Sequence, residues 1–248
     1  MKKVGIIGCG AIGTIISNAA DKGIVKCDKL ILYDRNLEKA ERIKKSMRNV
    51  QVEIVKSLDG MLKLKPTVIV EAASQEAVRE YAEKILAANI ELIVMSVGAL
   101  LNLKIKSNKI HIPSGAIGGL DAISSAMIAG IDKVTLTTRK NPKALDVNQK
   151  EGEKLIFEGT PIEAVKRFPK EMNVAATLAL TTSPNKVHVQ VIADPNVNRN
   201  VHEVRVKWKY GEMLFKFSNM PHPENPRTSA LAAWSAINLL KKILEKYV

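Results

Sequence analysis

Cysteine, aromatic residues and long apolar runs are all scarce in this chain of 248 residues, and each scarcity excludes a class of protein. Two cysteines, Cys9 and Cys27, are too few for a disulfide framework or a cysteine-ligated metal cluster, and they suit a reducing compartment. No histidine motif with metal-ligand spacing is present, so we predict no metal site. No apolar run reaches the length of a membrane span and no leader segment is recognisable, so we expect a cytoplasmic protein without a membrane partner.

The net charge of +13 raises the question of nucleic-acid binding. The basic excess is spread evenly along the chain, without a basic arm or a run of five like charges. Aromatic residues make up only 4%, so stacking surfaces for single strands are scarce. We therefore expect no nucleic-acid partner. A basic surface that attracts an anionic cofactor and substrate explains the charge more simply.

The most informative stretch is an N-terminal glycine motif, GCGAIG at residues 8–13, which directly follows an apolar strand. Gly8 permits a tight turn, Gly10 lets the backbone approach a pyrophosphate, and Gly13 lets helix and strand pack closely. The anion then lies at the start of the next helix. Asp34 follows the second strand at the spacing of an acid that accepts hydrogen bonds from ribose hydroxyls. This arrangement predicts a dinucleotide site rather than an ordinary structural turn.

The first half alternates short apolar strands with helices, which is typical of a parallel sheet covered on both faces. We predict strands at residues 4–7, 30–33, 52–55, 67–71 and 92–96, and helices at 11–21, 37–47, 58–61 and 75–88. Asn36 is the expected cap of the second helix. The fold class is therefore α/β, with a Rossmann doubly wound parallel sheet over residues 1–113. Residues 71–74 and 96–99 should line its cleft.

The pattern changes after residue 113 to longer strands, at residues 134–139, 187–193, 204–208 and 214–217, joined in part by hairpin-like turns. We predict a second α+β domain over residues 114–248, with a mixed or antiparallel sheet and a helix at 174–181. A last helix, about 227–246, is expected to pack back on the first domain through an apolar face that includes Leu231, Trp234 and Ile237.

Three segments of the second half carry residues suited to chemistry. The glycine-rich loop SGAIGGLD, residues 114–121, can present backbone amides to a ligand or serve as a hinge. Asn173, after Pro169, is most simply a helix cap. The segment from Asp194 to Glu203 is predicted as a polar loop, and it contains His202, which is either a general acid/base or a structural histidine.

Taken together, these segments resemble the L-aspartate dehydrogenase family of NAD biosynthesis. The match runs through GCGAIG at 8–13, SGAIGGLD at 114–121, NVAAT at 173–177, Asp194-Pro195 with NVHE at 200–203, and NPRTSAL at 225–231. Glu171 departs from the family pattern, in which an amide precedes the NVAA segment. The first motif is shared with many Rossmann enzymes, whereas the last four in this order are much more specific.

The resemblance implies oxidative deamination of L-aspartate to iminoaspartate, with hydride transfer from Cα to nicotinamide, feeding quinolinate synthesis. It implies that His202 is the catalytic residue and that Ala116 and Asn173 contact the dinucleotide. Lys170, Arg199 and the amides of Gly118 and Gly119 are unranked candidates for binding the substrate carboxylates. The resemblance implies L-aspartate and iminoaspartate as small-molecule partners. We also expect a homodimer, because basic two-domain enzymes of this size often dimerise through a sheet. The predicted cofactor-binding residues are Gly8, Gly10, Ala11, Ile12, Gly13, Asp34, Arg35, Ala116 and Asn173.

Cofactor choice depends on two neighbouring residues. Asp34 favours NAD because its carboxylate repels a 2′-phosphate, whereas Arg35 is able to pair with that phosphate. We expect NAD to be used and NADP to be accepted. The alternatives are a related Rossmann oxidoreductase, of the homoserine dehydrogenase or dihydrodipicolinate reductase type, and a non-catalytic sensor that binds NADH.

Overall fold

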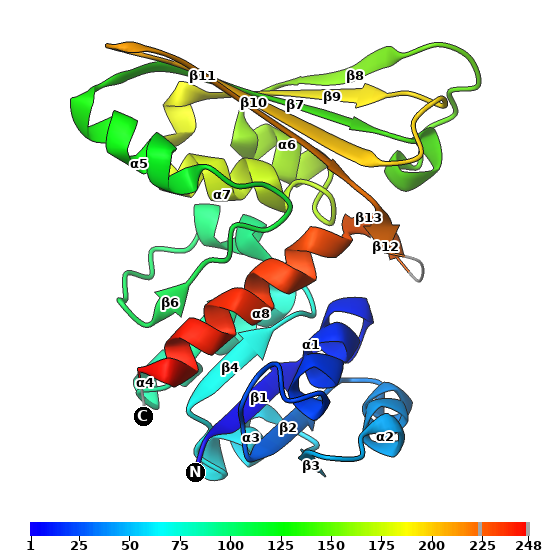
Figure 1. Ribbon diagram of the computed structural model, residues 1–248, viewed down its shortest axis with the longest axis vertical. Helices are drawn as coiled ribbons and strands as arrows, with labels where there is room; N and C mark the ends of the chain where they lie inside the picture. The colour runs from blue at the N-terminus through cyan, green and yellow to red at the C-terminus, as the bar shows by residue number, and fades with distance from the viewer. Residues whose placement is uncertain (223–224, 247–248) are drawn as a thin grey trace. The chain divides into compact units, whose positions relative to one another are not determined.

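The computed structural model describes residues 1–222 and 225–246, and the chain divides into two compact units (Figure 1). The first unit contains Met1–Pro113 and Ala233–Val248, and the second contains Ser114–Ala232. The main boundary therefore falls at residue 113, where the pattern of the sequence changes. The last helix, α8 (Ala230–Glu245), begins in the second unit, and from Ala233 onward it is grouped with the first.

The first unit is built on a six-stranded parallel sheet in the order β3-β2-β1-β4-β5-β6. Its strands are β1 (Lys3–Ile7), β2 (Lys29–Tyr33), β3 (Gln51–Ile54), β4 (Val68–Glu71), β5 (Glu91–Val94) and β6 (Ile110–His111). Its helices are α1 (Ala11–Asp21), α2 (Leu37–Ser46), α3 (Leu58–Lys63) and α4 (Gln75–Ala87), with a 3-10 turn η1 (Val97–Leu101). This strand order is that of a dinucleotide-binding doubly wound sheet, so the predicted fold of this half is confirmed.

The central strands of this sheet are buried on both faces, as their continuous apolar sequences predict. All four residues of β4 are buried, and β1 is buried from Val4 to its end. Asn36 caps α2 by accepting a hydrogen bond from the backbone N–H of Glu38, as predicted. Because β1 and β4 are neighbours at the point where the strand order reverses, their carboxyl ends mark the ligand crevice of this fold.

The second unit contains a five-stranded mixed sheet in the order β11-β10-β7-β9-β8. Its strands are β7 (Ile131–Lys140), β8 (Lys154–Gly159), β9 (Val187–Ala193), β10 (Asn200–Trp208) and β11 (Gly211–Asn219). The other elements are α5 (Leu120–Ala129), η2 (Pro142–Leu145), α6 (Pro161–Arg167), α7 (Asn173–Thr181), η3 (Pro184–Lys186) and the small ribbon of β12 (Pro221–His222) with β13 (Asn225–Ser229). The predicted mixed sheet and the β10–β11 hairpin are confirmed, although β7 separates β9 from β10.

This sheet is covered by helices on one face only. Burial alternates strictly along β9, and the residues of β7 and β10 that face the helices alternate with more exposed ones. Figure 1 shows α5, α6 and α7 on the same side of the sheet. The face opposite the helices carries Leu155, Ile192 and Leu214, of which Leu155 and Leu214 are exposed.

Among the predicted boundaries that differ from the structure, two change the interpretation of the second unit. Residues 200–203 are not the end of a polar loop but the start of β10, because Asn200 pairs with β11 and residues 201–203 pair with both β7 and β11. The last helix begins at Ala230 rather than near residue 227, because Asn225–Ser229 pairs with β12 instead. Along α8, Ile237 is buried as predicted, whereas Leu231 and Trp234 are exposed.

Candidate functional site

The glycine motif of the first unit forms a close-packed turn between β1 and α1. Gly8 has a φ of +98°, and an added Cβ there would lie 2.6 Å from the backbone of Ala72. A Cβ on Gly13 would overlap the carbonyl oxygen of Gly8. By contrast, a Cβ on Gly10 would meet no atom within 4 Å. Two of the glycines are therefore required by the fold itself, whereas Gly10 leaves open space beside the helix start.

That open space belongs to a cleft of about 230 Å³, which we call the glycine-loop cleft. It is lined by Ile7, Gly8, Gly10, Tyr33, Asp34, Arg35, Lys39, Ala72, Ala73, Ser74, Ala77 and Tyr81. Gly10 is also the N-cap of α1, and no side chain caps the helix there. The first-turn amides and the positive end of the helix therefore suit an anion such as a pyrophosphate. These residues fit a dinucleotide, and the predicted Gly8, Gly10, Asp34 and Arg35 all line one cleft.

Asp34 is held rigidly at the end of β2. Its Oδ2 accepts a hydrogen bond from the backbone N–H of Cys9 at 2.7 Å, and its Oδ1 accepts one from Asn36 at 2.8 Å. Each carboxylate oxygen retains capacity for another donor. The Asp34 carboxylate is therefore anchored to the glycine loop and lines the cleft beside it.

The opposite wall of the cleft is fixed by a buried carboxylate, Glu71. Its Oε1 accepts hydrogen bonds from the backbone N–H groups of Ala73 and Ser74 and from the Ser96 hydroxyl, while its Oε2 accepts one from the Ser96 backbone. Burial raises the pKa of Glu71, and these hydrogen bonds oppose that rise. The network joins the ends of β4 and β5 and orders residues 72–74. Of the two segments predicted to line the cleft, the structure places residues 72–74 there.

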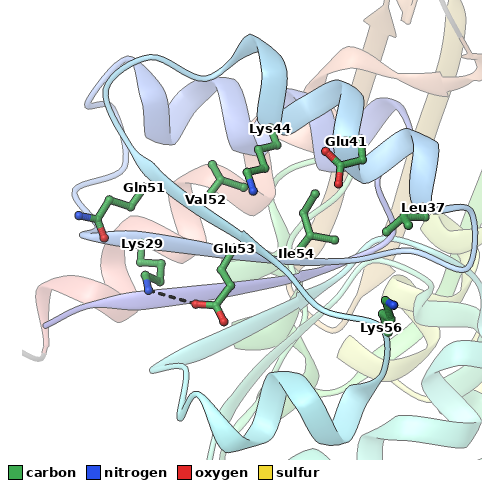
Figure 2. Close-up of a pocket in the computed structure, with 9 residues that line it drawn as sticks. All are labelled: Lys29, Leu37, Glu41, Lys44, Gln51, Val52, Glu53, Ile54 and Lys56. Carbon is green, nitrogen blue, oxygen red and sulfur yellow. Dashed lines mark hydrogen bonds and ion pairs between the residues drawn. The ribbon is translucent and has the colours of Figure 1, made fainter.

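A larger groove of about 530 Å³ lies at the edge of the same sheet, between β3 and α2 (Figure 2). Figure 2 shows lysine and glutamate side chains around it, with Lys29 paired to Glu53 at 3.1 Å. Its lining contains none of the residues predicted to bind the cofactor or to act in catalysis. The size of a groove alone therefore does not identify the functional site.

In the second unit, His202 lies on the buried face of the sheet. It stands directly opposite Thr138 in the pairing of β10 with β7, and its Nδ1 is 3.1 Å from the Thr138 hydroxyl oxygen. Only 2% of its surface is exposed. Strand pairing and burial therefore restrict the orientation of this imidazole. In that orientation Nδ1 contacts the Thr138 hydroxyl, and Nε2 is the other ring nitrogen.

Lys140 lies on the same buried face, two residues beyond Thr138, and is also only 2% exposed. Burial, together with the positive charge of Lys140, lowers the pKa of His202 to about 3. The imidazole is therefore neutral at physiological pH, which is the state that accepts a proton. Asn200 is buried beside these residues on β10, and its amide nitrogen lies 3.3 Å from the Ser229 hydroxyl. We call Thr138, Lys140, Asn200 and His202 the buried polar cluster.

The glycine-rich loop of residues 114–119 is tied to the strand that borders His202. Gly119 has a φ of +73° and immediately precedes α5, and an added Cβ there would lie 2.6 Å from the Phe215 ring. The Asn219 amide donates a hydrogen bond of 2.9 Å to the carbonyl oxygen of Ala116. Phe215 and Asn219 belong to β11, which pairs with β10. Strand pairing therefore links the loop that contains Ala116 to the buried polar cluster.

Asn173 is the first residue of α7 and not its cap. The cap position belongs to Met172, which makes no capping hydrogen bond through its side chain. The prediction of a capping role for Asn173 is therefore wrong. The predicted carboxylate candidates Lys170 and Arg199 are exposed.

Within residues 1–222 and 225–246, no cluster of three or more His, Cys, Asp or Glu side chains is arranged to hold a metal ion. In that same part of the chain, no helix is long and apolar enough to cross a bilayer.

Several oxidoreductases combine an N-terminal dinucleotide-binding domain with a second domain, and comparison with known proteins distinguishes among them. Residues 121–243 match the family model "Aspartate dehydrogenase, C-terminal", and residues 8–111 match "Homoserine dehydrogenase, NAD binding domain". The L-aspartate dehydrogenase of Methanosarcina mazei is 41% identical over 98% of this chain and 97% of its own length. That of Methanocaldococcus jannaschii is 41% identical over 99% and 98%. The crystal structure of aspartate dehydrogenase from Thermotoga maritima has a TM-score of 0.72 at 32% identity, covering 98% and 97%.

The chain belongs to the aspartate dehydrogenase family. The relatives that are 41% identical over nearly the whole chain decide this. The model matched by the second unit agrees with them, whereas the model matched by the first unit describes the NAD-binding domain of homoserine dehydrogenase. The predicted resemblance is therefore confirmed, and NAD(P) is the cofactor of the family.

Sequence reasoning missed Lys140, Thr138 and Asn200 as site residues of this aspartate dehydrogenase family member. The strand around residue 134 was expected to end at Arg139, which left Lys140 outside it. A signal was present, because the alternation of Val134, Leu136 and Thr138 on the inner face continues to position 140. A lysine at an inward position of a strand is unusual and indicates a functional or paired charge.

Proposed function

We propose that this protein catalyses NAD(P)-dependent oxidative deamination of L-aspartate to iminoaspartate, in the direction that feeds quinolinate synthesis. The observation that supports the catalytic part is the neutral, buried His202 beside Thr138 and Lys140. The names of the relatives from Methanosarcina mazei and Methanocaldococcus jannaschii support the choice of aspartate.

In this proposal, His202 is the base that takes the proton of the substrate amine. We assign the neutral tautomer with its proton on Nδ1, so that Nδ1–H donates to the Thr138 hydroxyl 3.1 Å away and the lone pair of Nε2 is left for the substrate. The amine proton moves to Nε2, and the nitrogen lone pair then forms the C=N bond as the Cα–H pair leaves as hydride. The nicotinamide supplies the acceptor for that hydride. At neutral pH the imidazole is unprotonated and able to accept a proton, although the burial that lowers its pKa also weakens it as a base.

Lys140 is our preferred partner for a substrate carboxylate. A buried ammonium binds a carboxylate more strongly than an exposed one, because water screens it less. Lys140 is 2% exposed and lies beside His202, whereas the sequence candidates Lys170 and Arg199 are on the surface. Lys140 thereby has two effects: it attracts the anionic substrate and it disfavours the protonated form of His202.

The roles of Ala116 and Asn173 as dinucleotide contacts remain proposals from the family motifs. The hydrogen bond from Asn219 to the Ala116 carbonyl supports an ordered loop there. Asn173 is the first residue of α7, and its proposed role comes from the NVAAT motif at residues 173–177. The cytoplasmic location also remains a proposal, supported by the low cysteine content.

We further propose that the chain forms a homodimer through the face of the second sheet that carries no helix. Leu155, Ile192 and Leu214 lie on that face, with 47% and 57% of Leu155 and Leu214 exposed. Light scattering should give a dimeric mass for the native protein and a monomeric mass for Leu214→Arg. A native protein that is monomeric at high concentration would contradict the dimer.

The deciding experiment measures NADH formation from L-aspartate, with absorbance as the readout. D-Aspartate, L-glutamate, L-homoserine and L-malate are compared with it. His202→Ala should lower kcat by about a hundredfold to ten-thousandfold, the usual contribution of a general base. His188→Ala is the matched control, because His188 is on the same sheet but is partly exposed and paired with Glu158.

Turnover of L-aspartate that persists in His202→Ala would remove His202 from catalysis but leave the activity intact. The absence of turnover with all five substrates, despite NADH binding, would contradict the aspartate assignment.

A further inference from the structure

The rim of the glycine-loop cleft carries an ion pair that joins two elements far apart in sequence. Arg35, in the turn after β2, places its guanidinium 2.9 Å from the Glu80 carboxylate on α4. A hydrogen bond with the Tyr81 hydroxyl and the charge of Glu80 raise the pKa of Arg35. The Tyr81 hydroxyl also lies 3.2 Å from that of Tyr33. Arg35 is therefore tethered to α4, although 70% of its side chain is exposed to solvent.

Arg35 and Tyr81 line the same cleft as Asp34 and Lys39. The Asp34 carboxylate is fixed by two backbone N–H groups, so it cannot turn away from a ligand. A dinucleotide with a free 2′-hydroxyl donates a hydrogen bond to that carboxylate, whereas a 2′-phosphate is repelled by it. A 2′-phosphate therefore depends on the cations at the rim, of which Arg35 is the one with a fork-shaped donor set.

We propose that Glu80 and Tyr81 are specificity-determining residues, because they hold Arg35 and so set how well the protein accepts NADP relative to NAD. A 2′-phosphate has to compete with the Glu80 carboxylate for the same guanidinium. Tyr81 keeps Arg35 close to the cleft, so that NADP is disfavoured without being excluded. We base this on the dinucleotide-binding part of the proposed function alone, and no step of it involves the substrate.

The test is the affinity of the purified protein for NADH and for NADPH, measured by fluorescence titration without substrate. Glu80→Gln retains the shape of the side chain and removes its charge, so it should raise the ratio of NADPH to NADH affinity by about two- to fivefold, the range for an exposed ion pair. Glu83→Gln is the matched control, because it removes the same charge from an exposed position on the same helix. The control should leave the ratio unchanged.

A double-variant cycle identifies the route of the effect. Arg35→Ala should lower NADPH affinity and leave NADH affinity nearly unchanged, and adding Glu80→Gln to it should then have no further effect on the ratio. Tyr81→Phe, which retains the buried ring, should lower NADPH affinity by a smaller factor than Arg35→Ala. Added salt should reduce the effect of Glu80→Gln, because the groups are exposed.

Equal ratios for Glu80→Gln and Glu83→Gln would overturn the selectivity role while leaving the dinucleotide site in place. A Glu80→Gln effect that persists in the Arg35→Ala background would also overturn it, because Glu80 would then act on the phosphate directly. A native protein that binds neither NADH nor NADPH would overturn the dinucleotide site itself, and the selectivity role with it.

Discussion

The glycine-loop cleft of the first unit is built mainly from backbone, whereas the buried polar cluster of the second unit is built from side chains. In the first unit, Gly8 and Gly13 leave no room for a Cβ, and Gly10 leaves space for a ligand. In the second, Thr138 and His202 meet across paired strands far apart in sequence. We infer that substitutions that add a side chain impair the glycine-loop cleft most. The buried polar cluster should instead be impaired most by substitutions that remove or neutralise a side-chain group.

The sharpest test of the backbone side of this comparison is a pair of glycine substitutions. Gly13→Ala should destabilise the fold by about 3 kcal/mol, because the new Cβ overlaps the carbonyl oxygen of Gly8. Gly10→Ala should leave the free energy of unfolding nearly unchanged and weaken NADH binding by about tenfold or more, because its Cβ enters only open space. Denaturant unfolding and NADH titration measure the two effects, and equal loss of stability in both variants would break the contrast.

The buried polar cluster should instead lose activity when a charge is removed. Lys140→Met retains the length and the apolar stem of the side chain, so packing on the inner face of β7 is largely preserved. Loss of a charged hydrogen bond to a carboxylate should lower kcat/KM for L-aspartate by about ten- to a hundredfold, mostly through KM. NADH affinity should be unchanged. A matched Lys133→Met variant, at an exposed position of the same strand, should leave kcat/KM unchanged.

The burial of His202 also predicts a pH dependence of stability. Its pKa is about 3 in the folded protein, against an ordinary value of 6.5. Between these values the unfolded chain binds a proton that the folded chain does not, so stability is full above the ordinary pKa and falls as the pH falls toward the folded value. The loss between about pH 7 and about pH 5 should be about 2 kcal/mol from this group. His202→Gln should remove that part of the slope in denaturant unfolding, and an unchanged slope would mean that the pKa of His202 is the same in the folded and unfolded protein.

The same contrast explains what the sequence revealed. Gly8, Gly10 and Gly13 lie within six residues and each has a local steric reason, so spacing alone predicted the turn, the helix start and Asp34 at the end of β2. The continuous apolar strands likewise predicted the parallel sheet. Lys140 and Thr138 could not be placed beside His202 in the same way, because their proximity depends on the register of β7 against β10. Register is a property of the paired strands, and one strand alone does not specify it.

The predicted start of β10 was wrong because its first residues are polar, and polar residues are compatible with either a loop or a strand that carries functional groups. The polar residues before β10 suggested a loop, yet Asn200 and His202 are buried members of the strand. An asparagine or histidine on an inner face contradicts the usual apolar pattern, and such exceptions occur where polar groups serve a ligand. The error in the sequence-based boundary therefore coincides with the proposed catalytic residue.

The smallest expected effect tests the side-chain hydrogen bond that holds the backbone of the glycine-rich loop in the second unit. Asn219→Ala removes the hydrogen bond to the Ala116 carbonyl, which ties the glycine-rich loop to β11. Because this hydrogen bond is only partly buried, we expect its removal to cost only about 1 kcal/mol in stability. If the loop positions a ligand, kcat/KM should fall by more than this small destabilisation would produce, and Asn219→Gln should not restore it, since the longer side chain misplaces the donor. Ser218→Ala, at an exposed neighbouring position, is the control. An Asn219→Ala variant with unchanged kcat/KM would show that the loop is held by its glycines and Phe215 alone, which would make it a second backbone-built element within the side-chain unit.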